Sequence, residues 1–394
     1  MENGHTKVKV GVIGVGVMGA LHARDVYESD LTKLVAVCDI DEARAQIIGE
    51  LYDAKVYFDY SKMLAEAEVD GVIVATPHYD HTPISIAALK KGIHVLTEKP
   101  IAVHVNDAQK MIAAYEKALE QYPELVFSAM FQQRTYGFWQ KIKALLDDGE
   151  LGRLLRTTWI ITDWYRTQSY YDGGGWRATW QGEGGGVLLN QCPHNIDLYQ
   201  WFVGMPQRVS GFAALGKYHN IEVEDEVTAV FEHDNGMVGH FITTTAESPG
   251  TNRLEIVGEN GKLVFEDGKL TFYRNRYSAL EQIKHASGAY DKVENWVIDV
   301  PYTHHGEPGH RFVIENFARA IANEKALIAP AVEGLHSIML ANAILYSALT
   351  RQQVSLPLDG DAYEVKLREL IENSDFQKPV HAPRSGDEEM GKSF

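Results

Sequence analysis

Cysteine is nearly absent from this chain: among its 394 residues only Cys38 and Cys192 are cysteines. Two thiols cannot build the disulfide framework of a small secreted domain, which agrees with a reducing compartment. The sequence also lacks any run of about 18 apolar residues, and its first residues lack the cationic and apolar parts of a signal peptide. These absences predict a cytoplasmic protein without a membrane segment.

Positive charge is scarce as well. The chain has 37 Lys and Arg residues against 54 Asp and Glu, a formal net charge of −17 at pH 7, and no basic cluster interleaved with aromatic residues. A surface of this sign repels polyanions, so nucleic acid is not an expected partner. The hydrophobic share of 45% and the charged share of 23% are ordinary for a soluble globular protein, and the length allows two or three domains.

The first part of the chain does contain a regular alternation of short apolar runs and helical segments. Strands are expected at 8–13, 34–38, 55–57, 71–76, 94–97 and 126–130, with helices between them. The run at 71–76 is too apolar for a half-exposed strand and suits one that is buried on both faces. The alternation predicts a doubly wound parallel sheet of six strands, typical of a Rossmann domain.

The first strand leads directly into Gly14-Val15-Gly16-Val17-Met18-Gly19, the GxGxxG pattern of a dinucleotide-binding turn. Glycines here permit a tight turn, close approach of the backbone to a pyrophosphate, and close packing of helix on strand. About 20 residues later Asp39 ends the next strand, where a carboxylate accepts hydrogen bonds from the ribose hydroxyls and repels a 2′-phosphate. We therefore expect NAD rather than NADP, contacted by Gly14, Gly16, Val17, Met18 and Asp39.

The apolar strand at 71–76 ends where a ligand would bind, because the crevice of an open parallel sheet lies beyond the carboxyl ends of its strands. Thr76, Pro77 and His78 stand at that end, and His81 lies one turn later. All four are candidates for contact with the nicotinamide half of the cofactor. Solvent-facing loop positions are the plainer explanation of the two histidines.

The strand at 94–97 stops abruptly at Glu98, Lys99 and Pro100. Its end delivers the charged pair to the same crevice, so Lys99 is a candidate for catalysis and both Glu98 and Lys99 are candidates for cofactor contact. The plainer alternative is a charged residue at an ordinary loop start, because such residues are common there. The bond between Lys99 and Pro100 is also a place to look for a cis peptide.

Consecutive strands replace the alternation in the second half. Apolar runs predict strands at 154–163, 207–214, 226–233, 237–245, 254–258, 261–266 and 269–274. Asp-Asn-Gly at 234–236 and Glu-Asn-Gly at 259–261 are hairpin turns, and strands joined by tight turns form an antiparallel sheet. Two helices are expected late in the chain, at about 310–323 and 332–350.

The change of pattern near residue 130 predicts a domain boundary. We expect an NAD-binding Rossmann domain over 1–130 and a second α/β domain, built on a large open and mainly antiparallel sheet, over 131–375. After about residue 376 the sequence is polar and has no periodicity, so a weakly ordered tail is expected over 376–394.

Polar residues concentrate in one stretch of helical spacing. Asn190, His194, Asp197 and Trp201 recur at intervals of three and four residues, which places them on one helix face. Three polar groups in one stripe need a cleft or mutual hydrogen bonds, because burying each one alone costs about 1–3 kcal/mol. Pro193 lies inside the pattern, so the helix is either kinked there or begins just before it.

The segment before this stripe is rich in aromatic side chains beside Arg and Asp, and Gly184 to Gly186 allow the backbone to approach a ligand. A carbohydrate pocket needs flat apolar faces for the sugar ring and charged forks for its hydroxyls, although a subunit interface is enriched in the same residues. The candidates for substrate contact are Asp163, Tyr165, Trp176 and Arg177, together with Asn190 from the stripe.

Three histidines, His304, His305 and His310, follow in a loop rich in Pro and Gly. A flexible loop without a thiolate supplies no fixed metal geometry, so we expect no metal there. A loop that closes over the substrate is the favoured interpretation, with His305 or His310 in contact with it.

Four pieces of the sequence, in this order and spacing, resemble the Gfo/Idh/MocA dehydrogenases: GVIGVGVMG at 11–19, Asp39, VIVATPHYDH at 72–81 and TEKPIAV at 97–103. The resemblance extends over about residues 7–357. It implies a Rossmann domain, a second domain with a large open sheet, hydride transfer to or from a nicotinamide, and dimers or tetramers formed through that sheet.

The resemblance also implies roles for the polar stripe. His194 matches the family's catalytic histidine and Asp197 an acid that is usually structural, whereas Asn190 stands where many members have an aspartate. An amide cannot accept a proton, so Asn190 can only hydrogen-bond a hydroxyl or hold His194. The string GEGGGVLLNQCPHNIDLYQW at 182–201 is most similar to members that act on glucose-type pyranoses, including oxidation of the 3-hydroxyl of glycosides.

The expected reaction is oxidation of a secondary hydroxyl of a sugar, polyol or glycoside with NAD⁺, or its reverse. His194 would take the hydroxyl proton, while Lys99, kept cationic by Glu98 and solvent, would stabilise charge on the substrate oxygen; Lys99 could itself carry the proton. Two other hypotheses are a transient redox cycle that ends in elimination or hydrolysis, and a non-enzymatic NAD-binding sensor. The presence of both Lys99 and His194 argues against a sensor, which needs neither.

Replacing Asp39 by alanine should erode the preference for NAD, because the carboxylate that repels a 2′-phosphate is lost. The measurement is kcat/KM with NAD⁺ and with NADP⁺ for both proteins. An unchanged ratio would mean that the ribose is recognised elsewhere.

Overall fold

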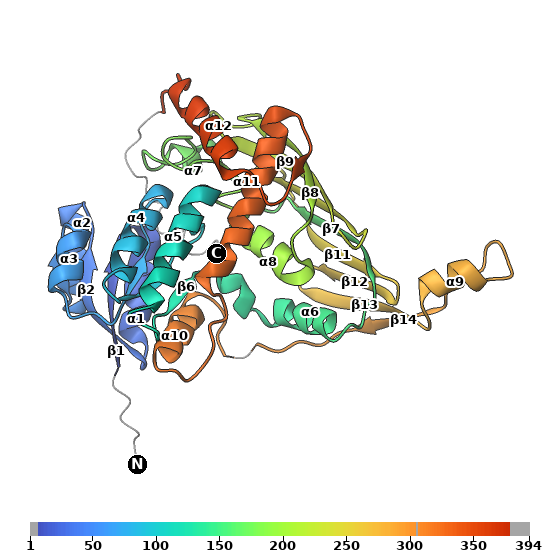
Figure 1. The fold of residues 1–394 in the computed structure, drawn as a ribbon, viewed down its shortest axis with the longest axis horizontal. Helices are drawn as coiled ribbons and strands as arrows, with labels where there is room; N and C mark the ends of the chain where they lie inside the picture. The colour runs from blue at the N-terminus through green and yellow to red at the C-terminus, as the bar shows by residue number, and fades with distance from the viewer. Residues whose placement is uncertain (1–6, 305, 379–394) are drawn as a thin grey trace, which may run out of the picture.

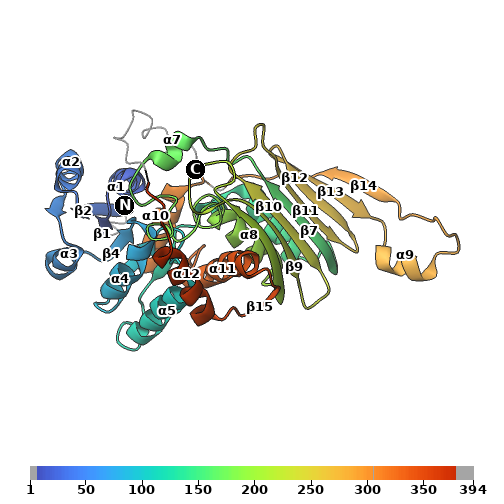
Figure 2. The same cartoon turned by 90° about the horizontal axis from the view of Figure 1, so that it is seen from above.

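The computed structural model describes residues 7–304 and 306–378, which form two sheets side by side along the long axis of the molecule (Figures 1 and 2). In the first sheet the strand order is β3-β2-β1-β4-β5-β6, and all neighbouring strands are parallel. The strands are β1 (Val8–Ile13), β2 (Thr32–Cys38), β3 (Lys55–Tyr57), β4 (Gly71–Val74), β5 (His94–Thr97) and β6 (Phe127–Ala129). The predicted doubly wound sheet is confirmed, and its order reverses between β1 and β4, where such sheets open a ligand crevice.

Helices cover both faces of this sheet because each strand is buried and must be followed by a crossover connection. The helices from this part of the chain are α1 (Val17–Glu28), α2 (Glu42–Tyr52), α3 (Tyr60–Glu66), α4 (His78–Leu89) and α5 (Val105–Leu119). One further helix, α10 (His310–Ile321), comes from much later in the sequence and packs against α1. Its Val313, Ile314 and Phe317 share a hydrophobic cluster with Val10 and Val12 of β1, so the chain returns to complete the Rossmann unit.

The second sheet has nine strands in the order β14-β13-β12-β11-β7-β10-β9-β8-β15. Only β7 and β10 pair in parallel among these neighbours, so the sheet is mainly antiparallel, as predicted. The strands are β7 (Leu154–Ile161), β8 (Arg208–Leu215), β9 (Glu224–Glu232), β10 (Val238–Thr244), β11 (Asn252–Gly258), β12 (Gly261–Glu266), β13 (Lys269–Asn275), β14 (Asn295–Asp299) and β15 (Val354–Ser355).

Helices cover one face of the nine-stranded sheet. They include α6 (Gly137–Asp147), α8 (Pro193–Val203) and α11 (Gly334–Thr350), with the shorter α7 (Gln168–Asp172) and the later α12 (Gly360–Glu372) nearby (Figure 1). By length and composition alone, residues 331–350 could cross a membrane, but α11 packs against β8 and α8 and most of that stretch is buried inside the protein. It is a core helix of the second domain.

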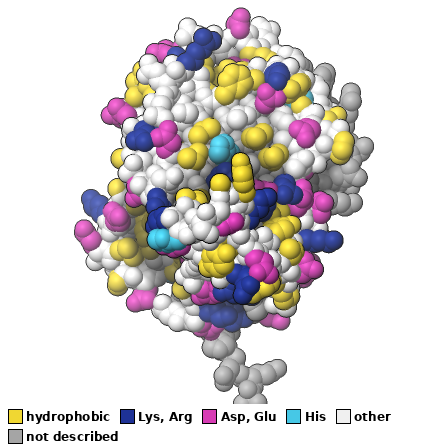
Figure 3. Space-filling view, turned by 90° about the vertical axis from the view of Figure 1, so that its right-hand side faces the viewer, with side chains coloured by type: hydrophobic (Ala, Val, Ile, Leu, Met, Phe, Trp, Pro, Cys, Tyr) yellow, Lys and Arg dark blue, Asp and Glu magenta, His cyan; other side chains and the backbone are white. Residues whose placement is uncertain are grey.

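An arm projects from the far end of the sheet, formed by α9 (Ala279–His285) and the edge strand β14 (Figure 1). No residue of α9 is buried, and all five residues of β14 are exposed. Ile283, Tyr290 and Val297 are 78%, 94% and 66% exposed, and at this end of the molecule hydrophobic side chains lie among charges of both signs (Figure 3). The sequence analysis predicted neither element, because both are short and their few apolar residues form no sustained period.

A buried ion pair fixes α8 to the rest of the molecule. Arg134, in the 3₁₀ turn η1 (Gln132–Thr135), donates two hydrogen bonds of 2.8 and 2.7 Å to the carboxylate of Asp197. Both side chains are 1% exposed, and Arg134 also contacts Glu333 in the short turn η2 (Ala331–Glu333). Asp197 therefore holds the helix, as the family resemblance implied for an acid at this position.

Replacing Asp197 by alanine should lower the free energy of unfolding by about 3–5 kcal/mol, because it leaves the Arg134 guanidinium buried without its main counter-charge. Removing both charges, in Arg134→Met with Asp197→Leu, should recover most of the loss. Urea unfolding measures both. The matched control is Glu232→Ala, which breaks the exposed pair with Arg208 and should cost far less, because solvent screens an exposed pair; an equal loss in that control would contradict the assignment.

Candidate active site

Helix α8 carries most of the predicted polar stripe. It begins at Pro193, a position in the first turn where the missing N–H has no helical carbonyl to bind. The helix therefore starts at the proline and is not kinked by it. His194, Asp197 and Trp201 lie on α8, whereas Asn190 belongs to the turn before it.

Lys99 reaches this turn from the other domain. It follows β5, its peptide bond to Pro100 is cis, and its Nζ donates a hydrogen bond of 3.3 Å to the backbone carbonyl oxygen of Asn190. The bond joins the end of a Rossmann strand to the start of α8. The predicted catalytic lysine is thus bonded to the turn just before the helix that carries the predicted catalytic histidine, and Lys99 is the charge that acts most strongly on the pKa of His194.

His194 is buried but left without hydrogen bonds. It is 2% exposed, and neither ring nitrogen has a partner within residues 7–304 and 306–378. Burial, and after it the charge of Lys99, lowers the pKa of His194 well below its usual value. The imidazole is therefore neutral near pH 7, with a nitrogen available to accept a proton.

The pKa of Lys99 is also lowered, and burial is the largest cause. Glu98 and Glu183 oppose the shift, while Arg177 and Arg166 add to it. From the sequence we expected solvent to help keep Lys99 charged, and the structure corrects this expectation. The second domain covers the end of β5 and removes much of the solvent around Lys99. A lysine with a lowered pKa is better suited to proton transfer than one in water.

Glu98 is anchored to the dinucleotide-binding helix. Its Oε1 lies 2.6 Å from Nε2 of His22 in α1, and its Oε2 accepts a hydrogen bond of 3.0 Å from the backbone N–H of Lys99. Burial alone would raise the pKa of Glu98, but His22 and Lys99 together bring it below its usual value. His310 lies beside His22, with ring centroids 5.5 Å apart, so this predicted loop histidine contacts the cofactor helix.

The amide of Asn190 is fully engaged by protein groups. Its Oδ1 accepts hydrogen bonds from Tyr170 (3.0 Å) and Gln191 (3.2 Å), and its Nδ2 donates to the carboxylate of Glu183. Glu183 is 1% exposed, and its other oxygen accepts from the N–H of Ala178 at 2.5 Å. Sequence reasoning missed Glu183 because the glycines beside it were interpreted only as a place where the backbone approaches a ligand.

The glycines of the first turn fit a bound dinucleotide. A side chain at Gly14, whose φ is +83°, would meet the backbone of Ala75 at 2.7 Å, and one at Gly19 would meet the oxygen of Gly14 at 1.8 Å. Gly16 has nothing within 4 Å of where a Cβ would lie, so the backbone there is open to a phosphate. Val17 and Met18 follow at the start of α1.

Asp39 ends β2 as predicted, 8% exposed. Its carboxylate accepts hydrogen bonds from the N–H groups of Val15 (2.8 Å) and Asp41 (2.9 Å), which ties it to the glycine turn. Arg44 of α2 lies 3.6 Å from the same carboxylate. The acid is thus held beside the place where the adenosine ribose of a dinucleotide would lie in this fold.

His78 and His81 are buried in the first turns of α4, 6% and 1% exposed, so the solvent-facing alternative is wrong. Nδ1 of His78 lies 3.1 Å from the carbonyl oxygen of Glu183, across the domain boundary. His81 lies 2.8 Å from two carbonyl oxygens, those of Thr76 and Pro100. It holds together the ends of β4 and β5, a role that the loop-like sequence Thr-Pro-His did not reveal.

The predicted substrate residues divide into two groups. Trp176 and Arg177 lie at the cleft: the Trp176 ring meets His78 edge-on at 5.4 Å, and Arg177 donates a hydrogen bond of 2.6 Å to the Tyr170 hydroxyl. Asp163 and Tyr165 are exposed, and Asp163 accepts a hydrogen bond from Asn252 on the sheet. His305 lies outside the described residues.

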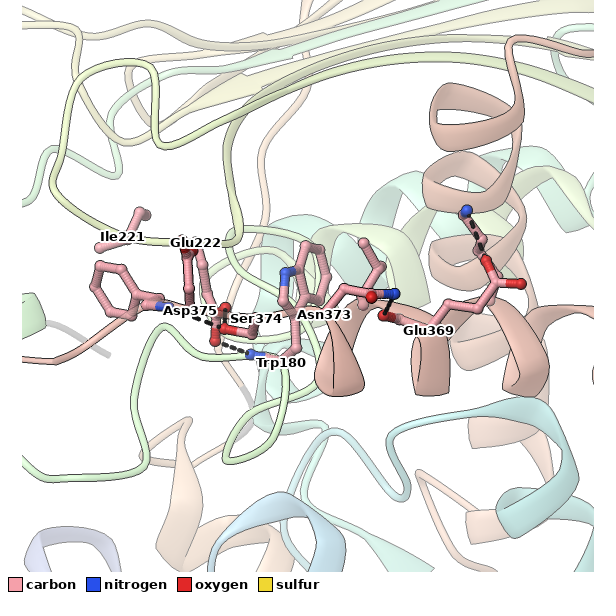
Figure 4. A pocket seen from close by; sticks show the side chains of 10 residues that line it. Trp180, Ile221, Glu222, Glu369, Asn373, Ser374 and Asp375 are labelled. Atoms are coloured by element: carbon pink, nitrogen blue, oxygen red, sulfur yellow. Dashed lines mark hydrogen bonds and ion pairs between the residues drawn. The ribbon is translucent and has the colours of Figure 1, made fainter.

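A surface pocket of about 360 Å³ lies beside this segment but contains none of the predicted site residues (Figure 4). On its wall, Glu222 accepts a hydrogen bond of 2.8 Å from the N–H of Trp180 and another from the hydroxyl of Ser374. These bonds attach the end of α12 to the loop that carries Glu183. Within residues 7–304 and 306–378, no group of three or more His, Cys, Asp or Glu side chains is arranged to hold a metal ion.

Residues 8–122 match the model of an oxidoreductase family with an NAD-binding Rossmann fold, and residues 139–264 match the GFO/IDH/MocA C-terminal domain. The chain belongs to the Gfo/Idh/MocA family. The resemblance inferred from the sequence is thereby confirmed, and NAD is the cofactor of its Rossmann domain.

Relatives within the family differ in their chemistry. An inositol 2-dehydrogenase of Rubrobacter xylanophilus is 25% identical over 72% of this chain and 78% of its own. A 2,7-anhydro-N-acetylneuraminate hydratase of Mediterraneibacter gnavus is 28% identical over 52% of this chain and 51% of its own. The crystal structure of the WlbA dehydrogenase from Chromobacterium violaceum with NADH and UDP-GlcNAcA is 29% identical, with a TM-score of 0.77 over 90% of this chain and 98% of the other.

A second buried acid, Glu224, supports the segment around Gly184, Gly185 and Gly186, which we call the glycine segment. It is fully buried at the start of β9; its Oε1 accepts a hydrogen bond of 3.1 Å from the N–H of Leu188, and its Oε2 has no partner in the described part of the chain. Burial raises its pKa to about 7. Near neutral pH the carboxyl is thus close to half protonated.

The raised pKa predicts a pH dependence of stability. Between the unfolded value of about 4.5 and the folded value of about 7, the native state holds a proton that the unfolded state has lost, so stability falls as the pH rises. The full effect is up to about 3 kcal/mol. Thermal unfolding of Glu224→Gln between pH 5 and 8 should show a weaker pH dependence than wild type and than the exposed control Glu232→Gln; parallel profiles would contradict this.

Proposed function

We propose that this protein transfers a hydride between a secondary hydroxyl of a sugar, polyol or glycoside and the nicotinamide of NAD. The observation that carries the proposal is the hydrogen bond from Lys99 to the carbonyl of Asn190, just before α8, together with the buried imidazole of His194 on α8, which has no hydrogen-bond partner among the described residues. The relatives support the substrate class, because one is an inositol dehydrogenase and another binds NADH together with a sugar nucleotide.

In the oxidation direction, His194 accepts the hydroxyl proton, for which its neutral, unpartnered ring is suited. Lys99 donates a hydrogen bond to the substrate oxygen and stabilises the negative charge that develops there. The bound NAD⁺ supplies the hydride acceptor. Because the pKa of Lys99 is lowered, this residue is the alternative carrier of the proton. Asn190 holds Lys99 through its backbone oxygen and carries no proton itself.

Exchanging Lys99 for Met, or His194 for Ala, should lower kcat with an accepted sugar by at least about 100-fold, because each removes a group that acts on the reacting oxygen. NAD⁺ binding, followed by fluorescence, should be retained. Lys217→Met removes an exposed lysine that pairs with Glu226 on the sheet and is the matched control. Turnover within about tenfold of wild type, a change near 1.4 kcal/mol, would remove the exchanged residue from the mechanism.

The hydratase among the relatives favours one second candidate, a transient redox cycle in which oxidation, elimination or hydrolysis, and re-reduction follow one another. The two candidates differ in the fate of the hydride. A simple dehydrogenase accumulates NADH in proportion to sugar consumed, whereas a closed cycle leaves no net NADH and retains tightly bound NAD. A screen of sugars, polyols and glycosides at 340 nm beside product analysis separates them.

We further propose a cytoplasmic homodimer or homotetramer formed through the uncovered face of the nine-stranded sheet. On β8, a side chain at Gly211 would point at Ile344 of α11, so the neighbouring Phe212 lies on the opposite face, where it is 65% exposed. The two cysteines are free and buried, which suits a reducing compartment. Light scattering of wild type and Phe212→Glu tests the assembly.

A further inference from the structure

Two arginines lie beside Tyr170. Arg166 follows β7, and Arg177 lies in the loop before the glycine segment; both guanidinium groups contact the ring of Tyr170, at 5.1 and 4.5 Å from its centroid. The Tyr170 hydroxyl donates to the side chain of Asn190, whose backbone oxygen accepts from Lys99, and both arginines act on the pKa of Lys99. Three cations of the chain therefore lie near one another.

Arg166 is held in place by its backbone. Its N–H donates a hydrogen bond of 2.8 Å to the carbonyl of Thr245, and its carbonyl oxygen lies 2.9 Å from Nε2 of His219. Its Nη1 donates to the carbonyl of Tyr165 at 2.9 Å, but its Nη2 is buried and has no partner among residues 7–304 and 306–378. A buried charged donor that makes no hydrogen bond costs more than about 1–3 kcal/mol, so Nη2 of Arg166 needs an acceptor.

Neither arginine forms an ion pair within 4 Å in the described part of the chain, and the nearby acids are already committed. Glu98 is bonded to His22 and to the N–H of Lys99, while Glu183 is bonded to Asn190 and to the N–H of Ala178. The two arginines therefore have no directly bonded counter-ion among the described residues, although the charges of Glu183 and Asp163 lie near enough for their pKa values to respond to Arg177 and Arg166.

Two other roles, neither of which needs a charged substrate, explain this cluster of cations less well. Stacking on Tyr170 contributes about 0.5–1 kcal/mol per exposed cation, yet it gives no acceptor to the buried Nη2 of Arg166. Binding the cofactor's pyrophosphate is the task of the open backbone at Gly16, at the start of α1, in the other domain. The arginines belong to the second domain, where the substrate must enter.

We propose that the substrate is an anionic carbohydrate whose carboxylate or phosphate is bound by Arg166 and Arg177, close to the hydroxyl that reacts at Lys99 and His194. A guanidinium presents a planar fork that fits either anion, and such charge-assisted bonds are stronger than bonds to neutral hydroxyls. This inference rests on the proposed function, because the arginines select the substrate that the dehydrogenase site then oxidises or reduces.

The test compares neutral and charged members of matched pairs: methyl β-glucoside with methyl β-glucuronide, and glucose with glucose 6-phosphate. We expect kcat/KM, and affinity for the NADH-loaded protein by calorimetry, to favour the charged member of one pair by at least about tenfold. Which pair responds identifies carboxylate or phosphate. Raising the salt concentration should reduce the preference, because ions screen the attraction.

Arg166→Gln and Arg177→Gln should each lower the affinity for the charged sugar by about 10- to 100-fold, the range expected for one lost charge-assisted hydrogen bond, and should thereby remove most of its preference over the neutral partner. Arg166→Lys should retain part of it and guards against a folding defect in the glutamine variant. Arg208→Gln removes the same charge from an exposed pair with Glu232 and should leave the preference as in wild type.

The outcomes separate this inference from the proposed function. If a charged sugar binds and loses affinity in the arginine variants but no sugar yields NADH, the inference stands and simple dehydrogenation fails. If neutral sugars react and the charged partners bind no better, or if the arginine variants lose affinity for NADH rather than for the sugar, the inference is overturned. Equal losses for both members of a pair would overturn it as well.

Discussion

The hydrogen bond from Lys99 to the carbonyl of Asn190 is the contact on which the site depends, because it connects the end of a Rossmann strand to the turn that starts α8. Each partner is fixed from behind. Glu98 ties the lysine segment to α1 through His22, and Asp197 ties α8 to η1 through Arg134. A cleft between two domains can hold reacting groups to a fraction of an ångström only if both walls are braced in this way.

Some of the buried polar groups that the protein leaves unsatisfied belong to segments of the proposed site. Both nitrogens of His194, Oε1 of Gln191, Oγ1 of Thr76 and Nη2 of Arg166 are buried without partners in the described residues, although others, such as the Tyr57 hydroxyl, lie elsewhere. Folded proteins bond most buried polar atoms, so each unsatisfied group in the site is costly and agrees with a place for a ligand. Asn190 shows the contrast, since its amide is fully bonded and its contribution is to position its neighbours.

Much of the fold could be predicted because its signals are local: the alternation of strands and helices, the glycine turn before α1, and Asp39 at the end of β2 each lie within a few residues. The errors arose where distant segments meet. His78 is held by the loop around Glu183, and α10 joins the Rossmann core from about 300 residues away. Glu183 itself carried no signal, because its importance comes from Asn190 and Lys99, which lie elsewhere in the sequence.

The position of Glu183 also bears on the aspartate that the family resemblance led us to compare with Asn190. An acid at position 190 would lie on the turn just before the helix that carries His194. In this chain the carboxylate comes instead from the glycine segment and raises the pKa of Lys99, whereas the charges that act on His194 are those of Lys99, Glu98 and His310. Glu183 therefore raises the pKa of Lys99, whereas the imidazole of His194 stays neutral. Arg177 and Arg166 oppose Glu183 and lower the pKa of Lys99, and a charged substrate would touch the same arginines, so binding such a substrate would itself raise the pKa of Lys99.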